Sequence, residues 1–129
     1  MRLLLVEHDA RLRSRIRRHV RTQWPDASFT SHPPETAGAL PAEFLAQGFD
    51  AVLLGQAWPG GDGLTWLRDL SARQGFAPVL FLAERADSDS AREARVAGAF
   101  AVITPADFDG RLQQVLHEAQ LLRRRTLAD

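Results

Sequence analysis

The sequence predicts an α/β domain in which helices cover both faces of a parallel β-sheet. Short apolar runs alternate along the chain with segments of helical periodicity, a pattern typical of repeated βα units. Several of the apolar runs are uninterrupted, as expected for strands that are buried on both faces. The chain has 129 residues, of which 45% are hydrophobic, so we expect one ordinary domain with one core.

Five apolar runs are the predicted strands. The first, third and fourth read as continuously buried. The five runs are Leu3 to Val6, Phe29 to Ser31, Ala51 to Leu54, Val79 to Leu82 and Phe100 to Ile103.

The first two helices are predicted from capping residues and apolar spacing. The first helix should begin after Asp9, whose carboxylate can cap it, and should end at Trp24-Pro25. A second helix is expected within Glu35 to Gln47, where Pro41 favours a division into two short pieces. The inward stripe of the first helix consists of Leu12, Ile16 and Val20.

The remaining three helices differ in the strength of their apolar faces. Leucines mark the third, only alanines mark the fourth, and the last has an amphipathic spacing with Asp107 as a candidate cap. The inward positions are Leu64, Leu67 and Leu70 in the third helix, Ala91, Ala94 and Ala97 in the fourth, and Phe108, Leu112, Val115, Ala119 and Leu122 in the last.

Composition and motifs argue against several function classes. Sixteen basic residues balance sixteen acidic ones, so no global field favours nucleic acid or an anionic membrane, and the absence of cysteine removes thiol chemistry. No apolar stretch approaches the ~20 residues needed to cross a bilayer. Neither a nucleophile elbow nor a phosphate-binding glycine loop is present. We therefore expect a soluble, cytoplasmic domain that is not an enzyme and carries no cofactor or metal.

Three segments together resemble the receiver domain of response regulators, the CheY-like domains. They are LLLVEHDARLR at 3–13, FDAVLLGQAWPGGDGL at 49–64 with its Pro59 to Gly63 turn, and the stretch 78–105. The resemblance implies a flavodoxin-like (βα)5 fold, a three-layer sandwich with strand order 2-1-3-4-5. It also implies a receiver-like domain at 1–122, with 123–129 as the helix end or the start of a linker to an absent effector domain.

The resemblance places a phosphorylation pocket at the carboxyl ends of the strands, but each position there departs from the family pattern. The acceptor aspartate is replaced by Gly55, the hydroxyl residue after the fourth strand by Ala83, and the lysine after the fifth by Thr104. In the acidic cluster, Glu7 and Asp9 flank His8, so the second acid of the pair is lost. The chain contains no lysine at all. We predict a degenerate pocket that cannot be phosphorylated and binds magnesium weakly or not at all.

Two residues of this region have open interpretations. A protonated His8 between Glu7 and Asp9 would place a positive charge where the family holds magnesium, or the residue merely fills a degenerate pocket. Trp58 either closes over the vacant pocket as a lid or is exposed for a partner.

A third open interpretation concerns the six arginines of the first helix. They favour a solvated or protein-binding face over nucleic-acid binding, because no aromatic residues are interleaved with them.

Three functions remain open, all on the same fold. The first is a phosphorylation-independent signalling module that binds a protein partner or forms a homodimer, through the surface of the fourth helix, fifth strand and fifth helix. The second is a small-ligand or pH sensor that uses the emptied pocket. The third is an unconventional phosphoryl acceptor at Glu7, Asp9 or Asp62.

Overall fold

The computed structural model describes residues 1–31, 48–58, 61–72 and 77–128. In it, five parallel strands form one sheet with the order β2-β1-β3-β6-β7. The strands are β1 (Arg2–Val6), β2 (Ser28–Ser31), β3 (Ala51–Gly55), β6 (Val79–Leu82) and β7 (Ala101–Ile103). This is the predicted order 2-1-3-4-5, and the five strands match the five apolar runs to within one residue at each end. The uninterrupted runs explain the burial, because every residue of β3 and β6, and all of β1 after Arg2, is buried.

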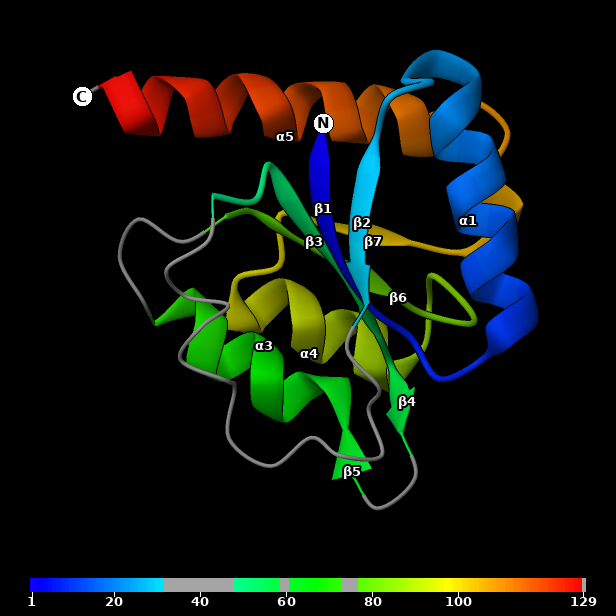
Figure 1. Cartoon of the computed structure of the whole chain (residues 1–129). Helices are drawn as coiled ribbons and strands as arrows, with labels where there is room; N and C mark the ends of the chain where they lie inside the picture. The colour runs from blue at the N-terminus through cyan, green and yellow to red at the C-terminus, as the bar shows by residue number, and fades with distance from the viewer. Residues whose placement is uncertain (32–47, 59–60, 73–76, 129) are drawn as a thin grey trace.

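Four described helices cover the two faces of the sheet. They are α1 (Ala10–Gln23), α3 (Gly63–Ser71), α4 (Asp89–Ala97) and α5 (Arg111–Ala128). Helices α1 and α5 lie on one side of the sheet, and α3 and α4 lie on the other (Figure 1). Alternate residues of each strand supply the two cores; Leu3 and Leu5 pack with the first pair of helices, whereas Leu4 and Val6 pack with the second. The helix predicted within Glu35 to Gln47 falls outside the described residues.

The predicted start of α1 is confirmed. The Asp9 carboxylate accepts hydrogen bonds from the backbone N–H groups of Arg11 at 2.8 Å and Leu12 at 3.4 Å. At the other end, the N–H of Trp24 donates to the Val20 carbonyl at 2.9 Å and closes the helix. Helix α4 forms despite its alanine-only face, because the Ser88 hydroxyl caps it and Ala91 and Ala94 are fully buried against the sheet.

Two expectations for the last helix are wrong. Asp107 does not cap α5; it ends a short 3-10 helix (Pro105–Asp107), and its carboxylate accepts hydrogen bonds from the N–H and hydroxyl of Thr104. Leu122 is 41% exposed and does not belong to the buried stripe, which continues from Ala119 to Arg123, four residues on. Helix α5 runs on to Ala128, through the segment predicted as a helix end or linker.

The loop after β3 contains a small element that the sequence does not predict. Two short strands, β4 (Ala57–Trp58) and β5 (Gly61–Asp62), pair in antiparallel fashion outside the main sheet. The side chains of these four residues lie outside the described part of the structure, so the lid predicted for Trp58 is not described.

Candidate functional site

The carboxyl ends of four neighbouring strands bring the predicted pocket residues together. Glu7 follows β1, Gly55 ends β3, Ala83 follows β6 and Thr104 follows β7. The pairing register places these ends side by side, since Val6 lies opposite Leu54 and Gly55 lies opposite Leu82. The ladder extends to the next strand as well, where the N–H of Ala83 donates to the Ile103 carbonyl at 2.9 Å.

The side chain of Glu7 lies directly over Gly55. A Cβ built on Gly55 would sit 2.1 Å from Glu7 Oε2 and 2.9 Å from Glu7 Cδ, which is far inside van der Waals contact. Glu7 is only 7% exposed, and its Oε1 accepts a hydrogen bond from the N–H of Asp9 at 3.2 Å. The carboxylate of residue 7 therefore occupies the space that any side chain at position 55 would need.

Burial dominates the electrostatics of Glu7. It raises the pKa of the carboxyl above the ordinary value of 4.5, because desolvation disfavours the charged form; the nearby Asp9 carboxylate acts in the same direction. The N–H groups of Asp9 and His8 and the charge of His8 oppose the rise without cancelling it. Glu7 is thus a shielded carboxyl that favours its neutral form more than an ordinary glutamate does.

The other acidic and polar residues of the site are engaged in local structure. Asp9 caps α1, so its carboxylate points at backbone N–H groups. The Thr104 hydroxyl donates to the Asp107 carboxylate at 3.0 Å. His8 is exposed, and its role as an internal cation stays a prediction. Within the described residues, no three His, Cys, Asp or Glu side chains are placed to hold a metal ion.

Two residues that the sequence analysis did not single out organise the loops of the site. Arg13, one turn into α1, donates to the carbonyls of Glu7 at 2.7 Å and His8 at 3.0 Å. Gln56 accepts a hydrogen bond from the Glu84 N–H through its side chain at 3.4 Å, and its own carbonyl accepts from the N–H of Gly63 at 2.9 Å. The only sequence signal for Arg13 is its position four residues after the helix cap. Gln56 gives no signal beyond following Gly55.

Steric crowding at the end of β3 explains why α3 begins with a glycine, Gly63. A Cβ on Gly63 would lie 2.1 Å from the Gly55 carbonyl oxygen and 3.3 Å from the ring of Phe81. The first turn of α3 can therefore approach the end of β3 only if residue 63 has no side chain. The close approach packs the first turn of α3 against the carboxyl end of β3, next to Gly55.

Comparison with solved structures identifies the fold. The response regulatory domain of protein mrkE from Klebsiella pneumoniae matches with a TM-score of 0.76 at 17% identity, over 97% of this chain and 99% of that one. This chain has the fold of a response-regulator receiver domain. No protein-family model and no curated protein matches it.

Two further structures show the same receiver fold. A CheY-like receiver domain from Methanospirillum hungatei JF-1 matches with a TM-score of 0.69 at 20% identity, over 94% of this chain and 97% of that one. The BeF3-activated N-terminal receiver domain of RstA from Klebsiella pneumoniae matches with a TM-score of 0.64 at 28% identity, over 90% and 98%. The flavodoxin-like architecture predicted from the sequence is thereby confirmed.

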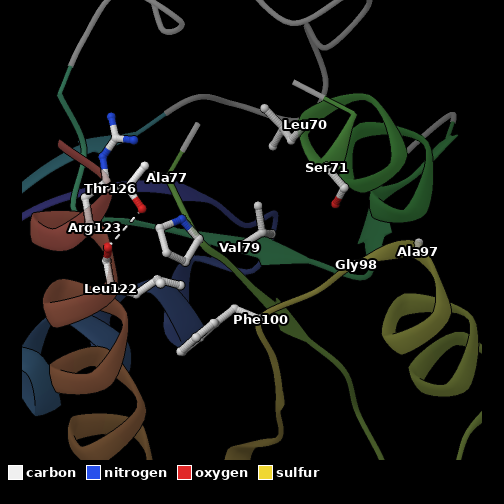
Figure 2. A pocket seen from close by; sticks show the side chains of 11 residues that line it. Leu70, Ser71, Ala77, Val79, Ala97, Gly98, Phe100, Leu122, Arg123 and Thr126 are labelled. Carbon is white, nitrogen blue, oxygen red and sulfur yellow. Dashed lines mark hydrogen bonds between the residues drawn. The ribbon is translucent and has the colours of Figure 1, made fainter. Parts of the chain in front are cut away.

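A cavity of about 340 Å³ lies at the opposite end of the sheet from this site. Leu122 and Thr126 of α5 line one side of it, Leu70 and Ser71 of α3 line the other, and Val79 lies between them (Figure 2). The alternative of a small-ligand sensor placed its ligand beside Gly55, where the Glu7 side chain lies. Among the described helices, none is both long and apolar enough to cross a membrane.

Proposed function

We propose that this chain is an atypical receiver domain of two-component signal transduction, which acts as a phosphorylation-independent protein-interaction or dimerisation module. The observation that carries the proposal is the Glu7 carboxylate over Gly55, at the place where the receiver family carries its acceptor aspartate. A glycine has no oxygen to attack phosphorus, and a carboxylate already fills the volume that an acceptor would need. The site is occupied by the protein's own side chain.

The surrounding groups support the same function. Phosphoryl transfer depends on positioned charges that stabilise the transferred group. Here Ala83 offers no hydroxyl, the Thr104 hydroxyl is bonded to Asp107, and the chain has no lysine. An unconventional acceptor at Glu7 or Asp9 is disfavoured, since the first is buried and the second caps α1.

The surfaces left for function are those that bind other proteins. Among the described residues, the exposed large hydrophobic side chains are Val96 on α4 and Leu121 and Leu122 on α5, at 89%, 39% and 41% exposure. These are the two helices of the interface expected from the sequence, formed by α4, β7 and α5. We propose this surface for a homodimer, for a protein partner, or for an effector domain fused in a longer protein.

A titration with magnesium and then beryllium fluoride, followed by amide NMR, tests the proposal. Beryllium fluoride mimics the phosphoryl group, and the BeF3-activated RstA receiver provides the positive control. We expect the peaks of Glu7, Gly55 and Ala83 to stay fixed while the control responds. Saturable shifts at these three residues would mean that a working anion or metal site survives, and the proposal would be withdrawn.

Sedimentation tests the interaction half of the proposal. If the α4 and α5 surface forms a dimer, the sedimentation coefficient should rise with protein concentration, and Leu121→Glu should abolish the rise. The exposed Arg124→Gln on the same helix serves as the control, because it alters charge without removing apolar area. A concentration-independent monomer would exclude the dimer and leave a heterologous partner.

The alternative of a small-ligand sensor has less support. It was motivated by the small residues Gly55 and Ala83, yet the room beside Gly55 is taken by Glu7 and Ala83 is 3% exposed within the core. A ligand-dependent rise in melting temperature that Glu7→Ala alters would favour the sensor over the interaction module.

A further inference from the structure

A stripe of three exposed arginines runs along the outer face of α1. Arg11, Arg15 and Arg18 follow the spacing i, i+4, i+7, which places them on one side of the helix. That side is opposite Ile16 and Val20, the two fully buried residues of α1. All three arginines are exposed, and about 10.5 Å of helix axis separates the first from the last. We call these three residues the arginine stripe.

No carboxylate of the described residues neutralises the arginine stripe. The guanidinium of Arg15 lies over the ring of Phe108, 5.1 Å from its centroid, a contact that supplies no formal negative charge. The side chains of Arg11 and Arg18 make no hydrogen bond or ion pair within residues 1–31, 48–58, 61–72 and 77–128. Helix α1 carries six arginines in all and neither aspartate nor glutamate. The stripe is therefore a concentrated positive charge on a protein whose formal net charge is zero.

This arrangement works against the stability of the helix itself. Like charges three or four residues apart repel one another, as Arg11 and Arg15 do, and so do Arg15 and Arg18. The Asp9 cap complements the helix dipole at the N-terminus of α1, but the first turn holds no further acid and Arg11 lies there with the unfavourable sign. An anionic partner that lies along the stripe would reduce the repulsion between the arginines and would offset the unfavourable charge of Arg11 in the first turn. Its binding therefore gains from charge complementarity that the free domain lacks.

The α3 and α4 side of a second copy is a poor counterpart for the arginine stripe. Several exposed acids on the α3 and α4 side are already paired within the molecule: Asp87 with Arg85 at 3.3 Å, Glu93 with Arg68 at 3.7 Å, and Asp89 with Arg92. A second copy that met the stripe with this side would have to break these ion pairs before it could offer those three carboxylates.

The charges beside the stripe favour a narrow partner over nucleic acid or a membrane. The exposed carboxylates of Asp109 and Glu118 lie on the α5 side of the molecule, and Asp109 is 3.7 Å from His19 of α1. A wide polyanionic surface such as a duplex or a membrane would meet these carboxylates as well as the arginines. None of the described aromatic side chains is exposed for base stacking or for insertion into lipid. In Figure 1, α1 packs on the sheet beside α5, and no described element covers its outer side.

We propose that the arginine stripe is a docking surface for an acidic segment of a partner protein. The inference rests on the proposed function only in that it names the chemistry of the partner. Carboxylates spaced i, i+4, i+7 on a helix would repeat at the same interval as Arg11, Arg15 and Arg18. The surface is separate from the α4, β7 and α5 face, so one domain could bind two proteins at once.

The test uses the whole 129-residue chain and a synthetic helical peptide with glutamates at i, i+4 and i+7. Amide NMR should show saturable shifts along α1, and they should weaken as salt rises because the contacts are exposed. The glutamine version of the peptide should not bind. Arg11→Gln/Arg18→Gln should weaken binding by roughly threefold to tenfold, as expected for the loss of two exposed charge pairs.

The matched control is Arg124→Gln/Arg125→Gln, which removes the same charge from two exposed arginines of α5. The control should bind like the wild type. An equal loss in both variants, or no saturable shift at about 1 mM peptide, would overturn the proposal. Tighter binding of single-stranded DNA or of phosphatidylserine vesicles through the same residues would also overturn it, in favour of that class of ligand. The beryllium fluoride titration is independent of these outcomes, so failure of the docking surface and failure of the proposed function are distinguishable.

Discussion

A single methyl group at position 55 tests whether Glu7 occupies the acceptor space. In Gly55→Ala the new Cβ would lie 2.1 Å from Glu7 Oε2 and 3.2 Å from the Val6 carbonyl oxygen, so the Glu7 side chain must turn away. It would lose the hydrogen bond from the Asp9 N–H, worth about 0.5–1.5 kcal/mol. Overpacking costs about 1–3 kcal/mol, and part of this is offset when the carboxylate reaches water. We expect a net loss of about 1–2 kcal/mol.

Urea denaturation of a double-mutant cycle measures this effect. In a Glu7→Ala background only the 3.2 Å contact with the Val6 carbonyl oxygen opposes the methyl group, and Gly55 has no left-handed φ that would disfavour alanine. There Gly55→Ala should cost clearly less than in the wild type, because the lower entropy of the unfolded chain offsets that contact by about 0.4–1 kcal/mol. Gly48→Ala, whose Cβ would have only an ordinary contact at 3.9 Å, is the control and should show no coupling to Glu7. If Gly55→Ala costs the same in both backgrounds, Glu7 does not fill the acceptor space.

Three further predictions concern stability. Burial raises the pKa of Glu7 above 4.5, so the contribution of Glu7 to the free energy of unfolding is full below pH 4.5 and is lost as pH rises through the folded pKa. The stability of the wild type relative to Glu7→Gln should therefore fall over that range. Parallel stability curves for the two proteins would contradict this. Burial acts to raise the pKa of Asp107, but the bonds from Thr104 outweigh it and lower the pKa below 3.8. Asp107→Asn should therefore cost about 0.5–2 kcal/mol at neutral pH, and less as pH falls through the folded pKa; a cost unchanged at low pH would refute it. Both Gly98, at φ +108°, and Gly110, at φ +105°, have a backbone conformation that alanine disfavours, but only a Cβ on Gly98 would meet another atom, the Ser71 hydroxyl at 3.0 Å. Gly98→Ala should therefore lower the melting temperature more than Gly110→Ala. Equal losses would show that only backbone strain matters.

Much of the fold could be predicted because its signals are local. Uninterrupted apolar runs such as Ala51 to Leu54 indicate strands buried on both faces, and the Asp9 cap fixes the start of α1. The errors arise where two local options compete. Asp107 can cap a helix that follows it or bond back to Thr104, and only the geometry of the turn decides between them. On α5, the sequence spacing allows either Leu122 or Arg123 to continue the inward stripe after Ala119.

The site could be predicted as a gathering of positions but not as an arrangement of side chains. Parallel strands bring their carboxyl ends to one edge, so Glu7, Gly55, Ala83 and Thr104 had to converge. Which way Glu7 turns depends on packing and desolvation around a residue 48 positions away in the chain, and no motif records it.

Control of the proposed interaction module must come from contacts that differ between two conformations, because a ligand shifts an equilibrium only through such differences. Arg13 offers one route, since its guanidinium joins α1 to the carbonyls of Glu7 and His8 and lies between Arg11 and Arg15 in the sequence. An acidic peptide that shifts α1 should therefore also move the amide peaks of Glu7 and His8. In Arg13→Gln the shifts along α1 should remain, whereas those at Glu7 and His8 should shrink. If both sets persist unchanged, the two hydrogen bonds of Arg13 do not transmit the movement, and the site over Gly55 is insensitive to what binds on α1.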